Sequence, residues 1–506
     1  MSMNRRDLVK LGAAAAIGSY ATRALGGRSA SGASEAIEKW GAYEISLPGP
    51  SSGNPFVETQ LKATFQHEHR SVEVAGFYDG DGDYRLRFMP DTLGKWSWET
   101  SSNAADLNGK TGMFACVAPS PGNHGPVGVA HQFHFQYADG SPFFPFGTTC
   151  YSWAFLGETL ENATLETLRT APFNKVRMCL LPKPVLDIEL FALPFPRDAS
   201  GTNDFTRFDP AYFQHIEKGV QELLQLGIEA DLILFHPYDI WGYEAMPLED
   251  ADRYLRYSVA RLSAYRNVWW SLANEYDLIR TRTPADWDRF FRVVQESDPY
   301  SHLRSVHHSR VLYDHSKPWV THASLQTFAF ENTAEWRAAW QKPIIFDEMQ
   351  YEGDISSRWG NLSPQEMTRR FWMALISGAY ATHGETYVTS FEGPVTADGG
   401  KLLGSSPQRI AFLKKLLQGS TSAGLNSVDG SYYLCAATPH VVYLYFFDYH
   451  EPANYEFPLP DTETFVAELI DPWEMTITSI PGTFSGNSKL KLPGKPYLGV
   501  RFQKTT

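Results

Sequence analysis

The sequence predicts an α/β fold in which a (β/α)8 TIM barrel is flanked by an N-terminal and a C-terminal β-sandwich domain. Eight short apolar runs in the middle of the 506 residues alternate with segments of helical spacing, which is the pattern of a parallel sheet with crossover helices. Period-two alternation of apolar and polar residues dominates on both sides of that region. The chain is also longer than one ordinary domain. Together these observations predict three folded modules.

The N-terminal residues indicate an export signal. Arg5 and Arg6 precede an apolar stretch at residues 11–17, and small residues continue through Ala24. We therefore expect a twin-arginine signal peptide over residues 1–34 and a periplasmic or secreted protein. The apolar stretch is too short to span a bilayer, so no stable membrane insertion is expected.

Residues 37–120 are predicted to form the N-terminal β-sandwich. Apolar and polar side chains alternate at residues 72–78, 84–88 and 96–100, and turn residues separate these runs. The acidic run at 79–83 resembles part of a calcium-binding loop, but it lacks the glutamate that closes such a loop. We favour a hairpin turn made by its Asp-Gly pairs.

The barrel is predicted over residues 121–420, after a linker rich in Pro and Gly. Its strands are expected at residues 143–149, 175–181, 229–235, 268–273, 304–307, 319–324, 343–347 and 379–383. Helical spacing predicts helices at residues 212–226, 251–265, 284–296 and 364–377. An insertion at 182–208 follows the second strand on the functional rim and is expected to shape the cleft. Period-two patterning returns over 421–506 and predicts the C-terminal β-sandwich.

Composition narrows the classes of function. The formal net charge is -13, and no run rich in Lys or Arg follows the N-terminus, which argues against a nucleic-acid partner. The four cysteines are too few and too scattered for a disulfide framework or a zinc site. Cys150 and Cys179 fall near the ends of the first two barrel strands, where they could pair, but we favour free, buried thiols.

Two of the predicted strands end at carboxylates. Asn274 and Glu275 follow the strand at 268–273, and Glu348 follows the strand at 343–347. Carboxylates are costly to bury without a purpose, and catalytic groups of (β/α)8 barrels lie at the carboxyl ends of the strands. A pair of carboxyl groups, one an acid/base and the other a nucleophile, is the arrangement of retaining glycosidases.

These residues resemble the retaining glycoside hydrolases of clan A. In that clan the acid/base follows an Asn at the end of the fourth strand, and the nucleophile ends the seventh. Arg177 and His236, near the ends of the second and third strands, match family-5-like members of the clan. A small sandwich that leads through residues 137–149 into the barrel is most similar to the apiosidase-like branch.

The resemblance implies a role for each residue. Glu275 would be the acid/base and Glu348 the nucleophile, with their carboxyls about 5–5.5 Å apart. Arg177 would keep Glu348 ionised and fix its rotamer, and Asn274 would hydrogen-bond the sugar 2-hydroxyl.

Three alternatives stay open at this point. Glu348 could be only a buried salt-bridge partner of Arg177. Asp347 and Glu352 are rivals for the nucleophile. Asp347 neighbours Glu348 on a strand, so its side chain is expected to point away from the barrel axis.

Further substrate contacts are expected around the two carboxylates. Family-5-like enzymes carry a Trp near the end of the eighth strand, whereas this chain has Thr-His-Gly-Glu-Thr-Tyr at 382–387. No metal or other cofactor is expected, because no His pair shows the spacing of ligands on one helix face. The candidate substrate-binding residues are Asn274, Arg177, His236, His308, Trp153, Trp241, Glu385 and Tyr387.

The sequence therefore predicts a retaining O-glycoside hydrolase that acts on plant or microbial polysaccharide. Its partner would be an oligosaccharide or polysaccharide. Similarity to the apiosidase-like branch implies exo action that removes a pentose or another short side chain. A non-catalytic carbohydrate-binding protein on a degenerate barrel is the alternative from a different class.

Overall fold

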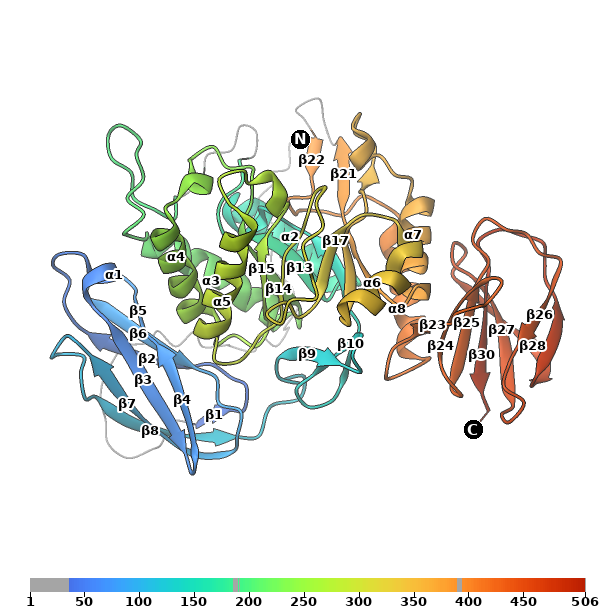
Figure 1. The fold of residues 1–506 in the computed structure, drawn as a ribbon, viewed down its shortest axis with the longest axis horizontal. Coiled ribbons are helices and arrows are strands. Elements are labelled where there is room, and N and C mark those ends of the chain that lie inside the picture. The colour runs from blue at the N-terminus through green and yellow to red at the C-terminus, as the bar shows by residue number, and fades with distance from the viewer. Residues whose placement is uncertain (1–35, 185–189, 191, 389–393, 506) are drawn as a thin grey trace, which may run out of the picture.

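A computed structural model describes residues 36–184, 190, 192–388 and 394–505. The predicted signal peptide at residues 1–34 lies outside these described residues. The chain forms a central eight-stranded barrel with one mainly antiparallel β module at each end of the molecule (Figure 1). The predicted fold class is confirmed.

Two facing sheets make up the N-terminal module. A five-stranded sheet has the order β1-β8-β7-β3-β4, and a three-stranded sheet has the order β2-β6-β5. Their buried faces share a core that includes Phe65, Trp96 and Phe114. The strands are β1 (Ala36–Glu38), β2 (Tyr43–Pro48), β3 (Leu61–His67), β4 (Arg70–Ala75), β5 (Phe77–Tyr78), β6 (Asp83–Phe88), β7 (Gly94–Ser102) and β8 (Thr111–Val117), with the short helix α1 (Pro55–Glu58) before β3.

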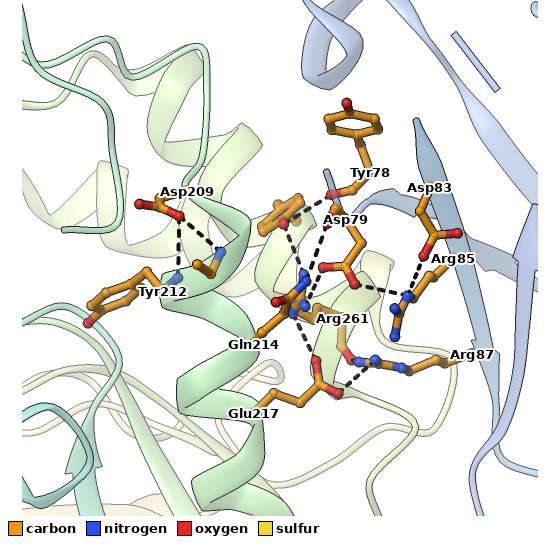
Figure 2. Close-up of polar contacts among 12 residues, drawn as sticks. Tyr78, Asp79, Asp83, Arg85, Arg87, Asp209, Tyr212, Gln214, Glu217 and Arg261 are labelled. Atoms are coloured by element: carbon orange, nitrogen blue, oxygen red, sulfur yellow. Dashed lines mark hydrogen bonds and ion pairs between the residues drawn. The ribbon is translucent and has the colours of Figure 1, made fainter. Parts of the chain in front are cut away.

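The acidic run at 79–83 is a hairpin turn between β5 and β6, as favoured from the sequence. Asp79 N–H donates to Asp83 O, and Asp83 N–H donates to Gly80 O, both at 2.8 Å. The turn has a second role at the junction with the barrel (Figure 2). Arg261 of the barrel binds Asp79 at 2.6 Å and Glu217 at 2.9 Å.

The same junction holds two more arginines. Arg87 of β6 pairs with Glu217 at 2.7 Å, and Arg85 pairs with Asp79 at 2.9 Å. The side chains of Arg87, Arg261 and Asp79 are almost wholly buried. Buried charges are stable only when paired, so this network locks the sandwich to the barrel in one orientation.

The barrel strands pair in the order β16-β15-β14-β13-β12-β20-β18-β17, and every ladder among them is parallel. A bridge between His307 and Ser324 joins the two ends of this sheet. The strands are β12 (Phe146–Thr149), β13 (Lys175–Cys179), β14 (Glu229–Phe235), β15 (Val268–Ala273), β16 (Arg304–Ser305), β17 (Ala323–Gln326), β18 (Ile344–Glu348) and β20 (Tyr380–His383).

Helices lie around the barrel, and several begin as the sequence predicts. Asp209, Thr283 and Ser363 each accept a backbone hydrogen bond at a helix start, and a proline follows each of them. The helices are α2 (Glu158–Thr170), α3 (Pro210–Gln225), α4 (Leu248–Leu262), α5 (Pro284–Ser297), α6 (Thr333–Trp340), α7 (Pro364–Ile376) and α8 (Ser406–Gln418).

Smaller elements complete the middle of the chain. A three-stranded sheet of β9 (Val127–Ala130), β10 (His134–Tyr137) and β11 (Pro142–Phe143) leads from the sandwich into the barrel (Figure 1). Another on the rim contains β19 (Glu352–Gly353), β21 (Glu385–Val388) and β22 (Pro394–Thr396). Short 3-10 turns lie at η1 (Trp153–Phe155), η2 (Tyr243–Ala245), η3 (Tyr276–Leu278), η4 (Phe330–Asn332) and η5 (Arg358–Gly360).

The C-terminal module packs against α7 and α8. Its six-stranded sheet has the order β23-β24-β25-β30-β27-β28, and β26 pairs with β29. Trp372 of α7 stacks on Phe446 of β25 with ring centroids 5.3 Å apart, so the barrel and this sheet share one core. The strands are β23 (Asn426–Ser427), β24 (Leu434–Thr438), β25 (Val442–Phe446), β26 (Asn454–Pro458), β27 (Phe465–Asp471), β28 (Thr476–Phe484), β29 (Asn487–Lys491) and β30 (Gly499–Lys504).

Two further properties follow from the described residues. All four cysteines are buried free thiols, including Cys150 and Cys179. None of the helices in the described part of the chain has the length and apolar character needed to cross a membrane.

Candidate active site

Two cations and two anions fill the interior of the barrel. Lys175 Nζ contacts Asp231 at 2.9 Å and Asp347 at 2.6 Å, and Arg177 contacts the same carboxylates at 3.3 and 3.4 Å. All four side chains are fully buried. The group has no net charge, which is how a low-dielectric interior tolerates ions. It forms a rigid floor beneath the strand ends.

The predicted orientation of Asp347 is wrong. Its carboxylate points into the barrel, where it also accepts hydrogen bonds from Ser324 at 2.6 Å and Thr382 at 2.7 Å. Phe346 packs outward on Phe330 and Trp336, so the next residue turns inward. A bulge follows: Leu325 pairs with Phe346, but the next residue of β17 pairs with Glu348, so β18 has one extra residue and Asp347 and Glu348 both lie on the interior side. A bulge breaks the alternation of side chains, and neighbouring residues no longer face opposite sides.

Glu348 ends β18 just above this floor. Its Oε1 accepts hydrogen bonds from the Tyr151 hydroxyl and from Asn274 Nδ2, the latter at 3.3 Å. Burial raises the pKa of Glu348, and the charge of Glu275 raises it further. The two hydrogen bonds and the charge of Arg177 oppose this shift in pKa because they favour the ionised carboxylate.

Glu275 follows β15 in the left-handed backbone region, with φ of 45°. A residue with a side chain is strained there, and such strain clusters at functional sites. Its Oε2 accepts a hydrogen bond from the Tyr238 hydroxyl, and its Oε1 accepts one from Gln326 Nε2 at 3.0 Å. The backbone N–H of Glu275 points to Nδ1 of His307 at 3.4 Å.

A chain of hydrogen bonds connects the two carboxylates. Asn274 Nδ2 donates to Glu348 at 3.3 Å and to the Tyr238 hydroxyl at 2.9 Å, and that hydroxyl donates to Glu275. Three such bonds in series keep the carboxylates within about 9 Å of each other. This limit covers the separations used by both retaining and inverting glycosidases.

Arg177 contacts a different partner from the one predicted. Its Nη2 donates to Asn274 Oδ1 at 2.8 Å, and its Nη1 lies near Asp231 and Asp347. The guanidinium therefore acts on Glu348 through its charge and through Asn274. Glu348 is not a plain salt-bridge partner of Arg177, because its oxygen is bound by Tyr151 and Asn274 instead.

His236 uses both ring nitrogens on the backbone. Its Nδ1 accepts from the Tyr238 N–H at 3.2 Å, and its Nε2 donates to Leu181 O at 3.1 Å. Burial lowers the pKa of His236 to about 4, which agrees with a neutral ring. The ring also stacks on Tyr238, with centroids 5.5 Å apart. His236 thus positions Tyr238 and has no ring nitrogen left for a sugar.

The two predicted tryptophans differ in exposure. Trp153 is only 1% exposed, and its ring packs against Gly219 of α3 within the core. This burial leaves no ring face for a sugar and corrects the expectation for Trp153. Trp241 is partly buried in the loop before α4, where it stacks on Tyr243 with centroids 5.8 Å apart.

The other candidates lie away from the bonded pair. His308 is buried beside the backbone of Ser324, and its Nδ1 has no hydrogen-bond partner among the described residues. The Tyr387 hydroxyl donates to Glu352 at 3.0 Å. Glu385 accepts from the backbone N–H groups of residues 403 and 404, and it belongs with Tyr387 to a second polar group around Glu352. Glu352, a rival nucleophile, is therefore held outside the pair.

Sequence reasoning missed three tyrosines and one glutamine that complete the site. The Tyr151 and Tyr351 hydroxyls lie 3.1 Å apart beside Glu348, while Tyr238 and Gln326 hold Glu275. Tyr151 and Tyr238 belong to the rim segments Tyr-Ser-Trp and Tyr-Asp-Ile-Trp. The position of both tyrosines just after barrel strands could have indicated that they belong to the site, whereas no sequence pattern indicated Gln326.

Comparisons with known proteins bear on this arrangement. A profile described as "Apiosidase-like, catalytic domain" matches residues 130–409, which is more than half of the chain. The chain belongs to the apiosidase-like family. Profiles for two domains of unknown function, DUF5060 and DUF5605, match residues 36–103 and 432–503 of this apiosidase-like protein. No curated protein sequence matches it.

Solved structures agree with the family. A protein from Bacteroides vulgatus assigned as a glycoside hydrolase is 38% identical, with 93% of this chain and all of that chain covered and a TM-score of 0.88. A family 5 glycoside hydrolase from the same organism is 14% identical over 76% of this chain and 95% of that chain, with a TM-score of 0.59, and shares the fold. The apiosidase-like protein is a glycoside hydrolase, and its substrate is a carbohydrate.

Proposed function

We propose that this glycoside hydrolase works by retaining double displacement, with Glu275 as acid/base and Glu348 as nucleophile. The observation that carries the pairing of the two carboxylates is the hydrogen-bonded chain from Glu275 through Tyr238 and Asn274 to Glu348. It joins two carboxylates from the ends of β15 and β18 over a buried, neutral floor. Such a pair on opposite sides of a sugar can donate a proton and attack carbon at the same time. The resemblance of both strand ends to the retaining enzymes of clan A supports the retaining course.

In the first step, Glu348 attacks the anomeric carbon while Glu275 gives its proton to the departing oxygen. The glycosidic C–O bond breaks, and an ester bond forms between the sugar and Glu348. Glu348 must be ionised for this attack. The Tyr151 and Asn274 hydrogen bonds and the charge of Arg177 supply that stabilisation against the effect of burial.

In the second step, Glu275 is ionised and removes a proton from water as the water attacks the same carbon. The ester bond breaks, Glu348 leaves as a carboxylate, and the sugar keeps its original anomeric configuration. Asn274 lies between the carboxylates, and its Nδ2 can exchange the 3.3 Å hydrogen bond to Glu348 for one to the sugar 2-hydroxyl. That contact strengthens at the transition state.

Azide rescue tests the two roles on a nitrophenyl glycoside that the enzyme cleaves. In Glu275→Ala, azide replaces water in the second step, restores turnover and gives a glycosyl azide of retained configuration. In Glu348→Ala, azide attacks directly and gives the inverted azide. Proton NMR of the products separates the two outcomes. Glu249→Ala, an exposed carboxylate on α4, is the matched control.

Folded Glu348→Ala with a near wild-type rate overturns the nucleophile assignment and favours a degenerate barrel. An initial product of inverted configuration from the wild-type enzyme overturns the retaining mechanism while leaving the carboxylate pair in place.

For the substrate, we propose exo release of a pentose or another short side chain from a branched plant or microbial glycan. Two observations support this. The chain belongs to the apiosidase-like family, and a long insertion between β13 and α3 begins at the carboxyl end of a barrel strand, where it is expected to shape the cleft. Chromatography of products from a panel of branched polysaccharides tests this. Release of monosaccharide or short side chains is expected, whereas a ladder of internal oligosaccharides from an unbranched backbone contradicts it.

We also propose that the enzyme acts in the periplasm or outside the cell. The support is the order of charged, apolar and small residues at the N-terminus. Replacement of Arg5 and Arg6 by lysines should leave activity in the cytoplasmic fraction of a producing cell. Unchanged export of this variant excludes the twin-arginine route.

A further inference from the structure

A second cluster of ionisable side chains lies beside the active site on the rim of the barrel. It consists of Glu352 on β19, His383 at the end of β20 and Glu385 on β21. β19 and β21 are parallel and pair Glu352 directly with Glu385. Like charges that face each other across a ladder repel, and a cation between them would offset that repulsion.

His383 aims a nitrogen that has no hydrogen-bond partner among the described residues into this pair. The ring is fully buried, and its Nε2 lies 3.7 Å from Glu352 Oε2 and 3.7 Å from Glu385 Oε1. The other nitrogen, Nδ1, faces the Thr148 hydroxyl at 3.3 Å. Histidines that bind metals use one nitrogen as ligand and donate the other N–H to a second group in this way.

Surrounding donors hold both carboxylates in place. Both accept hydrogen bonds from the backbone N–H groups of residues 403–405, just before α8, so this segment orients them together. The contacts are Leu403 N at 2.8 Å and Gly404 N at 3.0 Å for Glu385, and Ser405 N at 2.9 Å, Tyr387 hydroxyl at 3.0 Å and Ser406 hydroxyl for Glu352. Carboxylates fixed by a second layer of donors are typical of a preorganised metal site.

Neither carboxylate of the cluster has a Lys or Arg partner within 4.0 Å among the described residues. Glu352 and His383 are fully buried, and Glu385 is 10% exposed. Burying two ionised carboxylates this close together costs free energy unless a cation neutralises them.

We propose that His383 Nε2 and one oxygen each of Glu352 and Glu385 bind a divalent cation. The three ligand atoms lie within 4.8 Å of one another. Metal–ligand bonds of about 2.0–2.2 Å span pairs of ligand atoms up to roughly 4 Å apart, so small side-chain rotations complete the site. One imidazole with two carboxylates suits Zn²⁺ or Mn²⁺ better than Ca²⁺, which takes oxygen ligands.

The ion would brace the active site. Tyr351, next to Glu352 in the chain, places its hydroxyl 3.1 Å from that of Tyr151 beside Glu348. A Cβ on Gly384 would lie 2.3 Å from the Tyr351 ring, so the segment between His383 and Glu385 packs directly on that tyrosine. A cavity of about 330 Å³ lined by Glu385 lies between α2 and residues 397–403, and it offers a path for the ion.

Metal titration of the full-length, tag-free protein tests the site. After dialysis against a chelator, Zn²⁺, Mn²⁺, Ca²⁺ and Mg²⁺ are added separately, and calorimetry and elemental analysis give the affinity and stoichiometry. One equivalent of Zn²⁺ or Mn²⁺ is expected, with a thermal midpoint that rises with metal concentration. Tighter binding of Ca²⁺ than of Zn²⁺ contradicts the proposed ligand set.

Glu385→Gln and His383→Asn should each weaken metal binding by about 100-fold or more. Each removes a direct ligand, and even the loss of a group that only orients a ligand costs about 10- to 100-fold in affinity. Glu166→Gln, an exposed carboxylate on α2, should bind as the wild type does. Equal binding in Glu385→Gln shows an adventitious surface ion and overturns the proposal. Less than about a tenth of an equivalent in the wild type also overturns it.

Discussion

Arg177 Nη2 donates a hydrogen bond of 2.8 Å to Asn274 Oδ1. This contact decides which end of the Asn274 amide faces the catalytic carboxylates, because the oxygen is turned toward the arginine. The nitrogen then points to Glu348 and to the Tyr238 hydroxyl. The charged floor of the barrel is thereby coupled to the chemistry above it.

Arg177→Lys should lower activity while largely keeping the stability of the fold. Lysine keeps the positive charge beside Asp231 and Asp347 but lacks the planar group that reaches Asn274. A shift of the Asn274 amide should lower kcat/KM by about 10²-fold. Arg177→Met should instead destabilise the fold by about 3–5 kcal/mol, since it leaves two buried carboxylates with only Lys175. Urea unfolding and steady-state kinetics distinguish the variants, and equal activity of Arg177→Lys and wild type rejects the coupling.

Tyr238→Phe should reduce turnover while leaving the fold intact. The lost hydroxyl is the group that joins Glu275 to Asn274, so both side chains gain freedom. We expect kcat/KM to fall roughly 10- to 100-fold, as for other losses of a positioned polar group. Tyr243→Phe is the matched control, because this neighbouring buried hydroxyl has no hydrogen-bond partner among the described residues. A similar loss in both variants points to general disturbance of the loop.

Glu348→Gln should be more stable than the wild type at alkaline pH. The pKa of Glu348 is raised from the ordinary value of 4.5, first by burial, so the folded protein holds this proton more tightly than the unfolded chain. Below the unfolded pKa both states are protonated, and the carboxyl and the amide differ little. As pH rises through the folded pKa, only the wild type loses stability.

Urea unfolding at about pH 4, 6 and 8 follows this difference in unfolding free energy. The gap between Glu348→Gln and wild type should widen as pH increases. A constant gap, or a gap that narrows, is incompatible with a raised pKa at this site.

Arg261→Gln should weaken the junction between the N-terminal sandwich and the barrel. Arg261 neutralises Asp79 and Glu217 in a buried network, and its loss leaves them undercompensated. We expect a loss of about 3–5 kcal/mol in the free energy of unfolding. Arg169→Gln, which removes an exposed pair with Glu166, should cost less than about 1 kcal/mol. Chemical denaturation compares the two, and similar small losses show that the junction does not depend on the network.

The strands that were predicted best are the ones buried on both faces. β14 (Glu229–Phe235) and β15 (Val268–Ala273) have the predicted bounds, because both are buried throughout and predominantly apolar despite the charged Glu229 and Asp231 in β14. The strand expected at 319–324 is β17 (Ala323–Gln326) instead. Its expected first half is occupied by a turn, in which Val320 N–H donates to Lys317 O.

The sequence alone predicted that Glu275 and Glu348 lie at two strand ends. It therefore also predicted the candidate carboxylate pair. Each follows an apolar run, and apolar runs are local signals. That Asp347 and Glu348 lie on the same side of β18 depends on a bulge, which arises from pairing with a strand more than 20 residues away. Likewise the cluster of Glu352, His383 and Glu385 forms only when three strands meet, so no spacing of ligands along one helix could reveal it.

The sequence by itself determined the barrel and the acids at its rim, because the pattern of apolar and polar residues along the chain predicts which segments are buried strands and where they end. Only the tertiary structure decided which polar groups touch, because hydrogen bonds between strand ends depend on register and closure.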